Sequence, residues 1–261
     1  MAKAKAVANT ALKIDDSLAE VHTSLATVKL MYDWDWPGSQ AEFERAIALK
    51  PNYALAWNHY AYGLAFVGQF DRAVAAVQRE IDLEPLSVTA NFDLAAIYLC
   101  TNHTDEAIRQ LQKVIEMDPT LPVAHHFLAN AYYQKGLYDK FIEKVIEVRS
   151  DPVLNDGDWS ALGLTADQVR RAYARGGLEA FLRGELEGVL ARSKKEYVAP
   201  KRIAVLYAML GESDKAMDWL ERTYQEHSKT IMSIKVDPRL ERIRSNPHFQ
   251  EMLKRVGLTQ P

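Results

Sequence analysis

The feature that most constrains this chain of 261 residues is a proline that returns at a fixed interval. Pro51, Pro85 and Pro119 stand 34 residues apart, and Pro152 follows one residue short of the next interval. The same spacing joins Leu94 to Leu128, Ala95 to Ala129 and Tyr98 to Tyr132. A period of this length is typical of stacked helix–turn–helix units, because one unit cannot bury its apolar face without neighbours. The sequence therefore predicts an all-α fold of antiparallel helix pairs.

The repeated text resembles the tetratricopeptide repeat, whose pattern runs W-x2-L-G-x2-Y, then A-x3-F, then P. Three successive units fill slots of this pattern with Trp57, Ala61, Leu64, Ala73, Val77 and Pro85, then Leu94, Ala95, Tyr98, Ala107, Leu111, Val114 and Pro119, then Leu128, Ala129, Tyr132, Val145 and Val148. The resemblance implies a right-handed α-α superhelix, a solenoid. It implies little about function, because such repeats are scaffolds whose partners are set by surface residues.

We expect one continuous solenoid in four parts. Residues 1–152 form the regular array, which starts with a lone second helix at Ala2–Ile14; residues 153–164 form an irregular insert; residues 165–230 form two divergent helix pairs; and residues 231–261 form a C-terminal cap. The cap is expected because its apolar residues have no further repeat to pack on: Ile231, Ile234, Val236, Leu240, Ile243, Phe249, Met252, Leu253 and Val256.

A partner is expected on the concave face, which the first helix of each pair lines in tetratricopeptide arrays. The residues expected to form this site are Asn58, His59, Tyr62, Phe66, Phe92, Asp93, His126, Asn130 and Tyr133. None is a lysine or an arginine, whereas families that grip the C-terminal carboxylate of chaperone tails use such residues there. Aromatic side chains with Asn and His suit an extended peptide or a partner helix. We therefore expect a protein or peptide partner, bound with weak dependence on salt.

Two further stretches extend the resemblance to nearly the whole chain: Tyr32–Gly38, and a tail that contains Lys235–Leu240 and Ser245–Phe249. Together they are similar to a bacterial tetratricopeptide domain at the C-terminal end of multidomain signalling proteins. In that family the repeats follow a Ser/Thr kinase, a nucleotide cyclase or a winged-helix DNA-binding module, often across a membrane helix. The resemblance implies the sensory or scaffolding part of a signalling protein, and this sequence contains none of those companion domains.

Self-association is the alternative function. A lone second helix leaves an apolar edge that another copy can cover, which would give a homo-oligomer. A less favoured alternative is an enzyme or a small-molecule-binding protein. It would need the insert, residues 153–164, to form a pocket with Asp156, Asp158 and Trp159.

The common catalytic signatures are absent from the sequence: it has no Gly-rich phosphate loop, G-x-S-x-G, H-E-x-x-H or C-x-x-C. A metal site that uses His59 and Asp93, one repeat apart, is disfavoured because zinc takes three or four protein ligands. The single cysteine, Cys100, lies in an apolar stretch typical of a core residue and excludes an internal disulfide. We therefore predict no enzymatic activity, no catalytic residue, no metal and no cofactor.

The chain does not have the charge distribution typical of proteins that bind nucleic acid or an acidic membrane. Its 32 basic and 35 acidic residues are interspersed and leave a net charge of −3. No apolar run approaches the ~18 residues of a membrane span. We expect a cytoplasmic chain that neither inserts into a membrane nor binds nucleic acid directly, although its parent protein can be membrane-anchored.

Two local features are expected to be structural. The tryptophans of the turn at residues 32–38, Trp34 and Trp36, can bind a partner or cover the end of a helix pair. The large area that aromatic side chains bury favours the second role. Glu80 stands in a slot that usually holds alanine, and we expect it either to reach solvent or to pair with Arg72 or Arg79.

Overall fold

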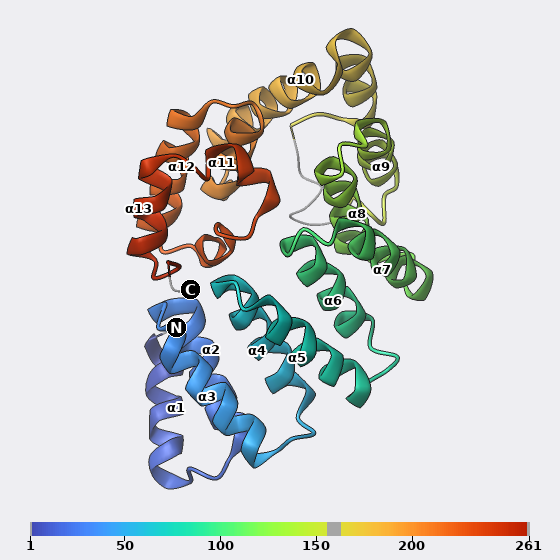
Figure 1. The fold of residues 1–261 in the computed structure, drawn as a ribbon. Helices are drawn as coiled ribbons and strands as arrows, with labels where there is room; N and C mark the ends of the chain where they lie inside the picture. The colour runs from blue at the N-terminus through green and yellow to red at the C-terminus, as the bar shows by residue number, and fades with distance from the viewer. Residues whose placement is uncertain (1, 156–162, 260–261) are drawn as a thin grey trace.

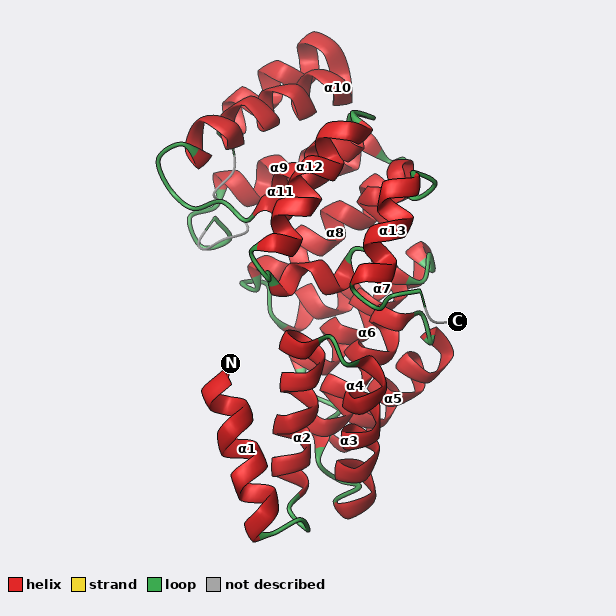
Figure 2. Ribbon diagram, turned by 90° about the vertical axis from the view of Figure 1, so that its left-hand side faces the viewer, coloured by secondary structure: helices red, strands yellow, loops and turns green. Residues whose placement is uncertain are grey.

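The computed structural model describes residues 2–155 and 163–259, and within these ranges the chain forms helices and turns without a strand (Figures 1 and 2). The elements are α1 Ala2–Ile14, α2 Ala19–Val28, η1 Lys29–Asp33, α3 Trp36–Leu49, α4 Ala54–Val67, α5 Phe70–Leu83, α6 Val88–Cys100, α7 Thr104–Met117, α8 Pro122–Gln134, α9 Tyr138–Ser150, α10 Ala166–Ser193, α11 Pro200–Met209, α12 Ser213–Gln225, η2 Lys229–Ser233, η3 Pro238–Ile243 and α13 Pro247–Arg255. Among the helices described, none combines the length and the apolar character needed to cross a membrane.

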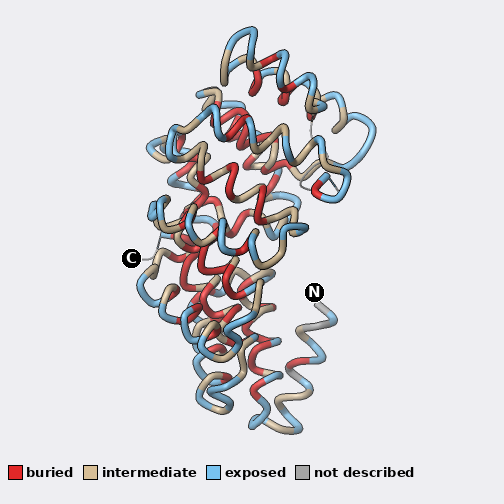
Figure 3. The backbone as a smooth tube through the Cα atoms, turned by 90° about the vertical axis from the view of Figure 1, so that its right-hand side faces the viewer, coloured by how far each residue is buried: buried red, intermediate tan, exposed pale blue. Residues whose placement is uncertain are grey.

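Each helix from α1 to α12 packs on the next one along the chain, which confirms the predicted all-α superhelix of helix pairs. The first helices of the pairs also contact one another in succession, α2 with α4, α4 with α6 and α6 with α8. Figure 1 shows α4, α6 and α8 on the inside of the curve, with α5, α7 and α9 on the outside. Buried positions follow the contacts between these two layers (Figure 3).

Small residues at one slot of the pattern explain how closely the helices of this core approach. Ala26, Ala61, Ala95 and Ala129 occupy that slot in successive first helices and are at most 3% exposed. A methyl group at a helix crossing lets two backbones come together without leaving a void. Phe141 breaks the pattern where an alanine stands in α5 and α7, and its ring packs edge-on to Phe181 of α10, with centroids 5.7 Å apart.

The repeat pattern predicts helices at about Ala54–Val67, Asp71–Leu83, Val88–Thr101, Asp105–Met117, Pro122–Lys135 and Asp139–Val148. The structure agrees with these boundaries to within two residues, and α4 matches its predicted range at both ends. The clearest difference follows α2, where the chain continues as the π-helical segment η1 and ends at Trp34 with a left-handed φ of 54°. A π-turn takes up one extra residue. This matches the turn here, which is one residue longer than in later units. The pair Gly176–Gly177 predicts a turn between two helices, and α10 kinks there, with φ 62° at Gly177.

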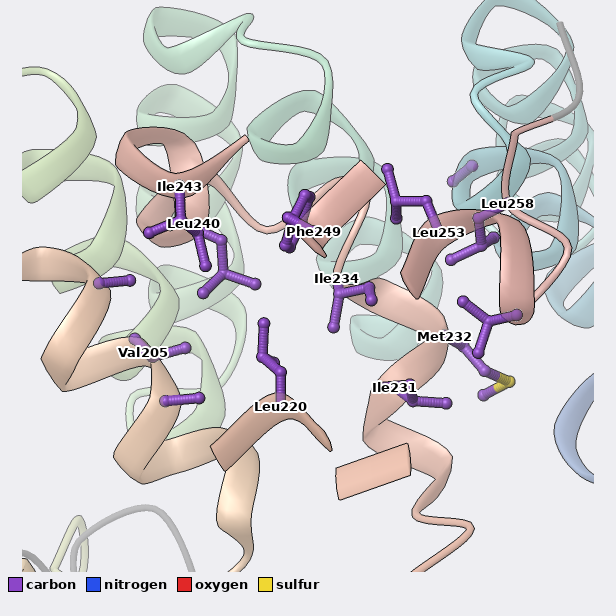
Figure 4. Close-up of a cluster of buried hydrophobic side chains, with 14 of the residues drawn as sticks. Val205, Leu220, Ile231, Met232, Ile234, Leu240, Ile243, Phe249, Leu253 and Leu258 are labelled. Atoms are coloured by element: carbon purple, nitrogen blue, oxygen red, sulfur yellow. The ribbon is translucent and has the colours of Figure 1, made fainter. Parts of the chain in front are cut away.

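Residues 229–258, here called the tail, comprise η2, η3 and α13; Figure 1 shows the segment between α12 and α13 inside the ring of helices and α13 beside α12 at the left-hand edge. Figure 4 shows their apolar side chains against the end of the array, where Ile231, Leu240 and Phe249 keep no exposed surface. The Lys235 ammonium also donates to the Val67 carbonyl oxygen at 2.7 Å, at the end of α4. The tail therefore packs on the last helix pair and also crosses to the inner layer of the array.

The tail ends against the first helix pair, so the superhelix closes on itself. The Trp36 indole donates to the Val256 carbonyl oxygen at 2.8 Å, across 220 residues of sequence. The Trp34 ring stacks on His227 with centroids 4.2 Å apart, and His227 Nε2 lies 2.8 Å from the Tyr32 carbonyl oxygen. Both tryptophans of the turn are therefore structural, and what they cover is the far end of the chain.

Candidate functional site: the inner face

The inner face is the surface of α4, α6 and α8 that lines the inside of the superhelix. The nine residues predicted there fall into two groups. Asn58 and Asp93 are buried, whereas the others keep part of their surface exposed: His59, Tyr62, Phe66, Phe92, His126, Asn130 and Tyr133. In this conformation the second group can touch a partner directly and the first cannot. That any of them binds a partner stays a prediction.

The two buried residues belong to one polar network that joins α4, α5 and α6. The Asn58 amide donates to both carboxylate oxygens of Glu80, at 3.1 and 3.2 Å, and to Asp93. The Tyr62 hydroxyl donates to the other oxygen of Asp93. A buried polar group is stable only when its hydrogen bonds are made. This network therefore holds three helices in register beneath the inner face.

Two carboxyl groups in this network, Glu80 and Asp93, share the Asn58 amide, and no cation of the described residues is bonded to either of them. Burial raises the pKa of Glu80 to about 7, against the hydrogen bond from Asn58, and the nearby Asp93 raises it further. Burial also raises the pKa of Asp93 to about 6, although the hydrogen bonds from Tyr62 and Asn58 oppose the shift. Near neutral pH the network therefore tends to retain a proton.

The sequence-based expectation for Glu80 was wrong. Its carboxyl neither reaches solvent nor pairs with an arginine, because the buried Asn58 amide supplies its donors. Arg72 instead pairs with Glu44 at 3.0 Å, and Arg79 lies 3.9 Å from Asp82.

His59 and Asp93 turn toward different partners. His59 Nδ1 lies 2.9 Å from the Thr27 hydroxyl of α2, and burial lowers the pKa of the imidazole. Within the two described stretches, no group of three or more His, Cys, Asp or Glu side chains is placed to hold a metal ion. His59 therefore joins two successive first helices.

The aromatic residues of the inner face divide by what they pack against. Phe66 lies against Tyr62 and Trp36, with centroid distances of 6.0 and 6.4 Å, and is packed against the main core. Phe92 of α6 meets Phe127 of α8 edge-on at 4.9 Å. Edge-to-face pairs of this kind stabilise packing by about 0.5–1.5 kcal/mol beyond their buried area. They join neighbouring repeats and leave part of each ring exposed.

Tyr133, the fourth Phe or Tyr predicted on the inner face, packs on the following helix, α9. Its ring meets Phe141 at 5.6 Å and Tyr138 at 5.8 Å. Burial raises the pKa of its hydroxyl. Removing this ring would therefore disturb α9 as well as the inner face.

The tail and α11 bring to the inner face the cations that α4, α6 and α8 lack. The Lys201 ammonium of α11 lies 2.9 Å from an Asp237 carboxylate oxygen. Arg239 donates two hydrogen bonds of 2.9 Å to the same carboxylate, one to each oxygen. Although burial opposes it, these two cations hold the pKa of Asp237 well below its usual range. Burial lowers the pKa of His126 to about 3, with help from Arg239 and other arginines. The tail's charges thus act directly on α8.

Two further cations of the tail, Lys235 and Arg242, donate hydrogen bonds to the C-terminal ends of first helices. Lys235 donates to the Val67 carbonyl oxygen beside Gly68, and Arg242 donates to the Met209 carbonyl oxygen at 2.9 Å beside Gly211. The last carbonyls of a helix have no partner within it and carry partial negative charge, so a cation there is stabilising. Sequence reasoning missed this set because it considered only the first helices. The signal was the run of three arginines in residues 239–244.

Cys100 lies among the same charged groups at the end of α6. Burial raises the pKa of its thiol to about 12, and the nearby Asp237 acts in the same direction. A thiol that stays protonated is a poor nucleophile. This agrees with the structural role expected from the apolar sequence around it.

The proposed pocket residues Asp156, Asp158 and Trp159 lie outside the described residues. The chain that follows them is fixed by a buried ion pair, since Arg149 Nη2 and a Glu185 carboxylate oxygen are 3.0 Å apart. Glu185 also accepts from the Leu164 amide at 3.3 Å, and Arg149 donates to the Leu164 carbonyl oxygen at 2.7 Å. This pair ties the start of α10 to α9.

Comparison with known proteins finds a family match over part of the chain. Residues 61–122 match the family model described as tetratricopeptide repeat. No curated protein matches the chain in sequence. Among solved structures, MamA is 22% identical with a TM-score of 0.46, covering 54% of this chain and 81% of that one. YrrB, described as a TPR protein with an unusual peptide-binding site, is 10% identical with a TM-score of 0.45, covering 95% and 97%. Pseudomonas aeruginosa pilF is 16% identical with a TM-score of 0.46, covering 95% and 86%.

Proposed function

We propose that this tetratricopeptide-repeat protein is a non-catalytic protein-binding module, and that a segment of its partner binds on the inner face. One observation carries the proposal. Partly exposed aromatic and amide side chains of the middle repeats, including Phe92 and Asn130, share the inside of the superhelix with arginines of the tail. Aromatic rings, an amide and guanidinium groups are the residue types that dominate protein interfaces.

The charge of the tail favours an acidic partner segment. Residues 235–244 contain four cations, Lys235, Arg239, Arg242 and Arg244, and two carboxylates, Asp237 and Glu241. The net charge of this segment is therefore +2, whereas the net charge of the whole chain is −3. Lys201 and Arg202 of α11 add to the same side. Binding should therefore weaken as salt rises, in place of the weak salt dependence expected from the first helices alone.

The partner would bind beside the tail and leave it in place. Ile231, Ile234, Leu240, Ile243 and Phe249 are completely buried. Burying each such side chain stabilises the fold by about 1.5–3 kcal/mol. A peptide that displaced the tail would have to compensate for exposing several of these side chains at once. That free energy exceeds what a short peptide gains on binding.

Fluorescence anisotropy with three labelled peptides of equal length, one acidic with aromatic residues, one neutral and one basic, tests the proposal. We expect the acidic peptide to bind tightest and to weaken when ionic strength rises from about 0.01 M to about 0.15 M. Arg242→Glu should weaken it about tenfold or more, because a cation becomes a like charge. Asn130→Ala should also weaken it.

The matched control is Arg109→Glu, which makes the same charge change at an exposed position of the outer helix α7. Arg242→Glu also removes the hydrogen bond to the end of α11, so its melting temperature should fall, and affinities are compared at a temperature at which circular dichroism shows every variant folded. Equal binding of the three peptides, or an equal loss in the Arg109→Glu variant, would show that the inner face is not the site.

From the resemblance of residues 32–38 and of the tail, we further propose that the chain is the sensory or scaffolding part of a bacterial signalling protein. The reading frame upstream of Met1 tests this. A kinase, cyclase or winged-helix domain encoded there supports the proposal, and a different neighbouring domain refutes it.

A further inference from the structure

The polar network beneath the inner face holds two carboxyl groups at one nitrogen atom. Oxygens of both Glu80 and Asp93 lie within 3.2 Å of the Asn58 amide nitrogen. The two residues are only 4% and 2% exposed. Carboxylates that share a buried site do not both ionise readily, because like charges repel strongly where water is excluded. The geometry therefore favours one retained proton.

The groups that surround the pair do not replace this proton. The Asn58 amide donates hydrogen bonds but carries no charge. Tyr62 of α4 donates to Asp93, and its hydroxyl is also neutral. Glu84 at the end of α5 is acidic, and its charge raises the pKa of Glu80 further. Among the described residues, the groups that shift the pKa of either carboxyl are thus neutral or acidic.

The other titratable side chains near the inner face keep one charge state around neutral pH. Burial lowers the pKa of His59, so its imidazole is largely neutral above pH 6.5. Burial also lowers the pKa of His126 to about 3 and raises the pKa of Cys100 to about 12. Between pH 6.5 and 8 the charge beneath the inner face therefore changes at Glu80 and Asp93, whose pKa values are about 7 and 6.

Tyr62 links this network to the surface that a partner would cover. Its hydroxyl donates to Asp93, while its ring is partly exposed on the inner face and packs against Phe66 at 6.0 Å. Burial raises the pKa of the hydroxyl well above its usual range, so it stays a donor. A partner segment over this ring removes water from above the carboxyls, and an acidic segment also adds negative charge. Both effects favour the protonated form of the pair.

We propose that the network is a proton switch, which takes up a proton when a partner segment covers the inner face. The inference rests on the proposed function for its partner, whereas the shared proton exists without one. Linkage is reciprocal, so a partner that raises the proton affinity of the network binds more tightly when the proton is present. Binding should therefore strengthen as pH falls from 8 to 6.5.

Isothermal titration calorimetry with the acidic peptide at pH 6.5 and pH 8 tests this linkage. A peptide without histidine and with blocked termini keeps its own charge over this range. We expect wild type to bind about threefold to tenfold more tightly at pH 6.5, which corresponds to an uptake of roughly 0.3–0.7 proton per bound peptide. Titrations in two buffers with different ionisation enthalpies count this proton directly.

The test variant is Glu80→Gln, which removes one carboxyl group and keeps an acceptor for Asn58. The ratio of its affinities at the two pH values should fall below about twofold, because the remaining carboxyl no longer has a charged neighbour. Glu116→Gln, at an exposed position of the outer helix α7, is the matched control and should keep the wild-type ratio. Equal wild-type affinities at the two pH values, or an unchanged ratio in Glu80→Gln, overturn the proposal.

The shared proton can be measured without a peptide. Carbon-13 NMR of the carboxyl groups should show Glu80 titrating near pH 7, and the ring signals of Tyr62 should move with the same midpoint. Tyr62→Phe should raise the midpoint of Asp93, because a hydrogen bond that favours its ionised form is lost. A Glu80 midpoint near its usual value of 4.5 overturns the proposal even where the peptide binds. A peptide that binds at neither pH refutes the proposed function, and the carboxyl titration then decides whether the switch exists.

Discussion

At the scale of single residues, the unusual feature is a pair of carboxyl groups that share one amide beneath the inner face. The predicted pattern identified Asn58 and Asp93 as surface residues because both stand on first helices. It could not show that Glu80 of the next helix faces the same point, because periodicity says which face a residue occupies and not which polar groups meet. Burial of this meeting point is the main cause of the raised pKa values of Glu80 and Asp93.

These two carboxyls make stability depend on pH. Glu80 ionises at about 4.5 in the unfolded chain and at about 7 in the folded one. A raised pKa of an acid means that the folded state binds more protons, so its stabilising effect is full below pH 4.5 and is lost as pH rises through 7. The free energy of unfolding should therefore fall by about 1–3 kcal/mol between pH 5 and pH 8, as the coupled pair loses its proton.

Glu80→Gln should remove much of this fall and raise stability at pH 8, because the amide accepts from Asn58 without a charge. Urea unfolding at both pH values measures it. Glu116→Gln, at an exposed position of α7, is the matched control and should change neither value by more than about 0.5 kcal/mol. An unchanged pH dependence in the Glu80 variant would show that its carboxyl is not the titrating group.

At the scale of elements, the turn after α2 and the end of α13 depend on each other. The Trp36 indole donates to Val256 inside the fold, whereas the Trp57 indole donates to the nearby Pro51 carbonyl oxygen at 2.9 Å on the surface. Replacing either Trp by Phe removes one indole N–H. Trp36→Phe should lower the free energy of unfolding by about 1–3 kcal/mol, because it leaves a buried carbonyl unpaired.

Trp57→Phe should lower the free energy of unfolding by less than about 0.5 kcal/mol, since water can replace the indole as the donor to the exposed Pro51 carbonyl oxygen. Urea denaturation of both variants gives the comparison. If the two substitutions cost the same, the Trp36 bond does not hold the ends of the chain together.

The elements also show where prediction from sequence ends. A residue repeated every 34 positions sets the helix boundaries, because helix length, cap and turn recur together, and α4 was predicted to the residue. The period does not set the partner of Asp139, which lies in the first turn of α9 after the N-cap Leu137 and accepts a hydrogen bond from Tyr173 of α10 at 2.7 Å. The path of the tail could not be predicted either, because no repeat specifies which surface its apolar residues cover.

At the scale of the whole molecule, closure should change how the chain unfolds. In an open solenoid each repeat touches only its neighbours, so the ends can unfold separately. Here the tail packs on α11 and α12 and touches α4 and the first pair. Amide hydrogen exchange should therefore show α2–α3 and α11–α12 opening together.

After removal of Ile231–Pro261, α2–α3 and α11–α12 should open independently of each other. The free energy of unfolding should fall by several kcal/mol, at roughly 25 cal/mol per Å2 of apolar area exposed. Mass spectrometry of exchanged peptides measures both effects. A truncated chain with unchanged melting temperature and unchanged exchange in α2–α3 would mean that the tail is an appendage.

The contact between Trp36 and Val256 also has a consequence for synthesis of the chain. Its two residues are 220 positions apart, so at about 5–20 residues per second a ribosome needs roughly 10–45 s to deliver the second after the first. The helix pairs between them involve only local contacts and can form as they emerge. Until residues 227–256 have left the ribosome, the aromatic turn of the nascent chain lacks the partners that cover it in the folded protein, and any message cut short before Val256 encodes a chain that does not close in this way.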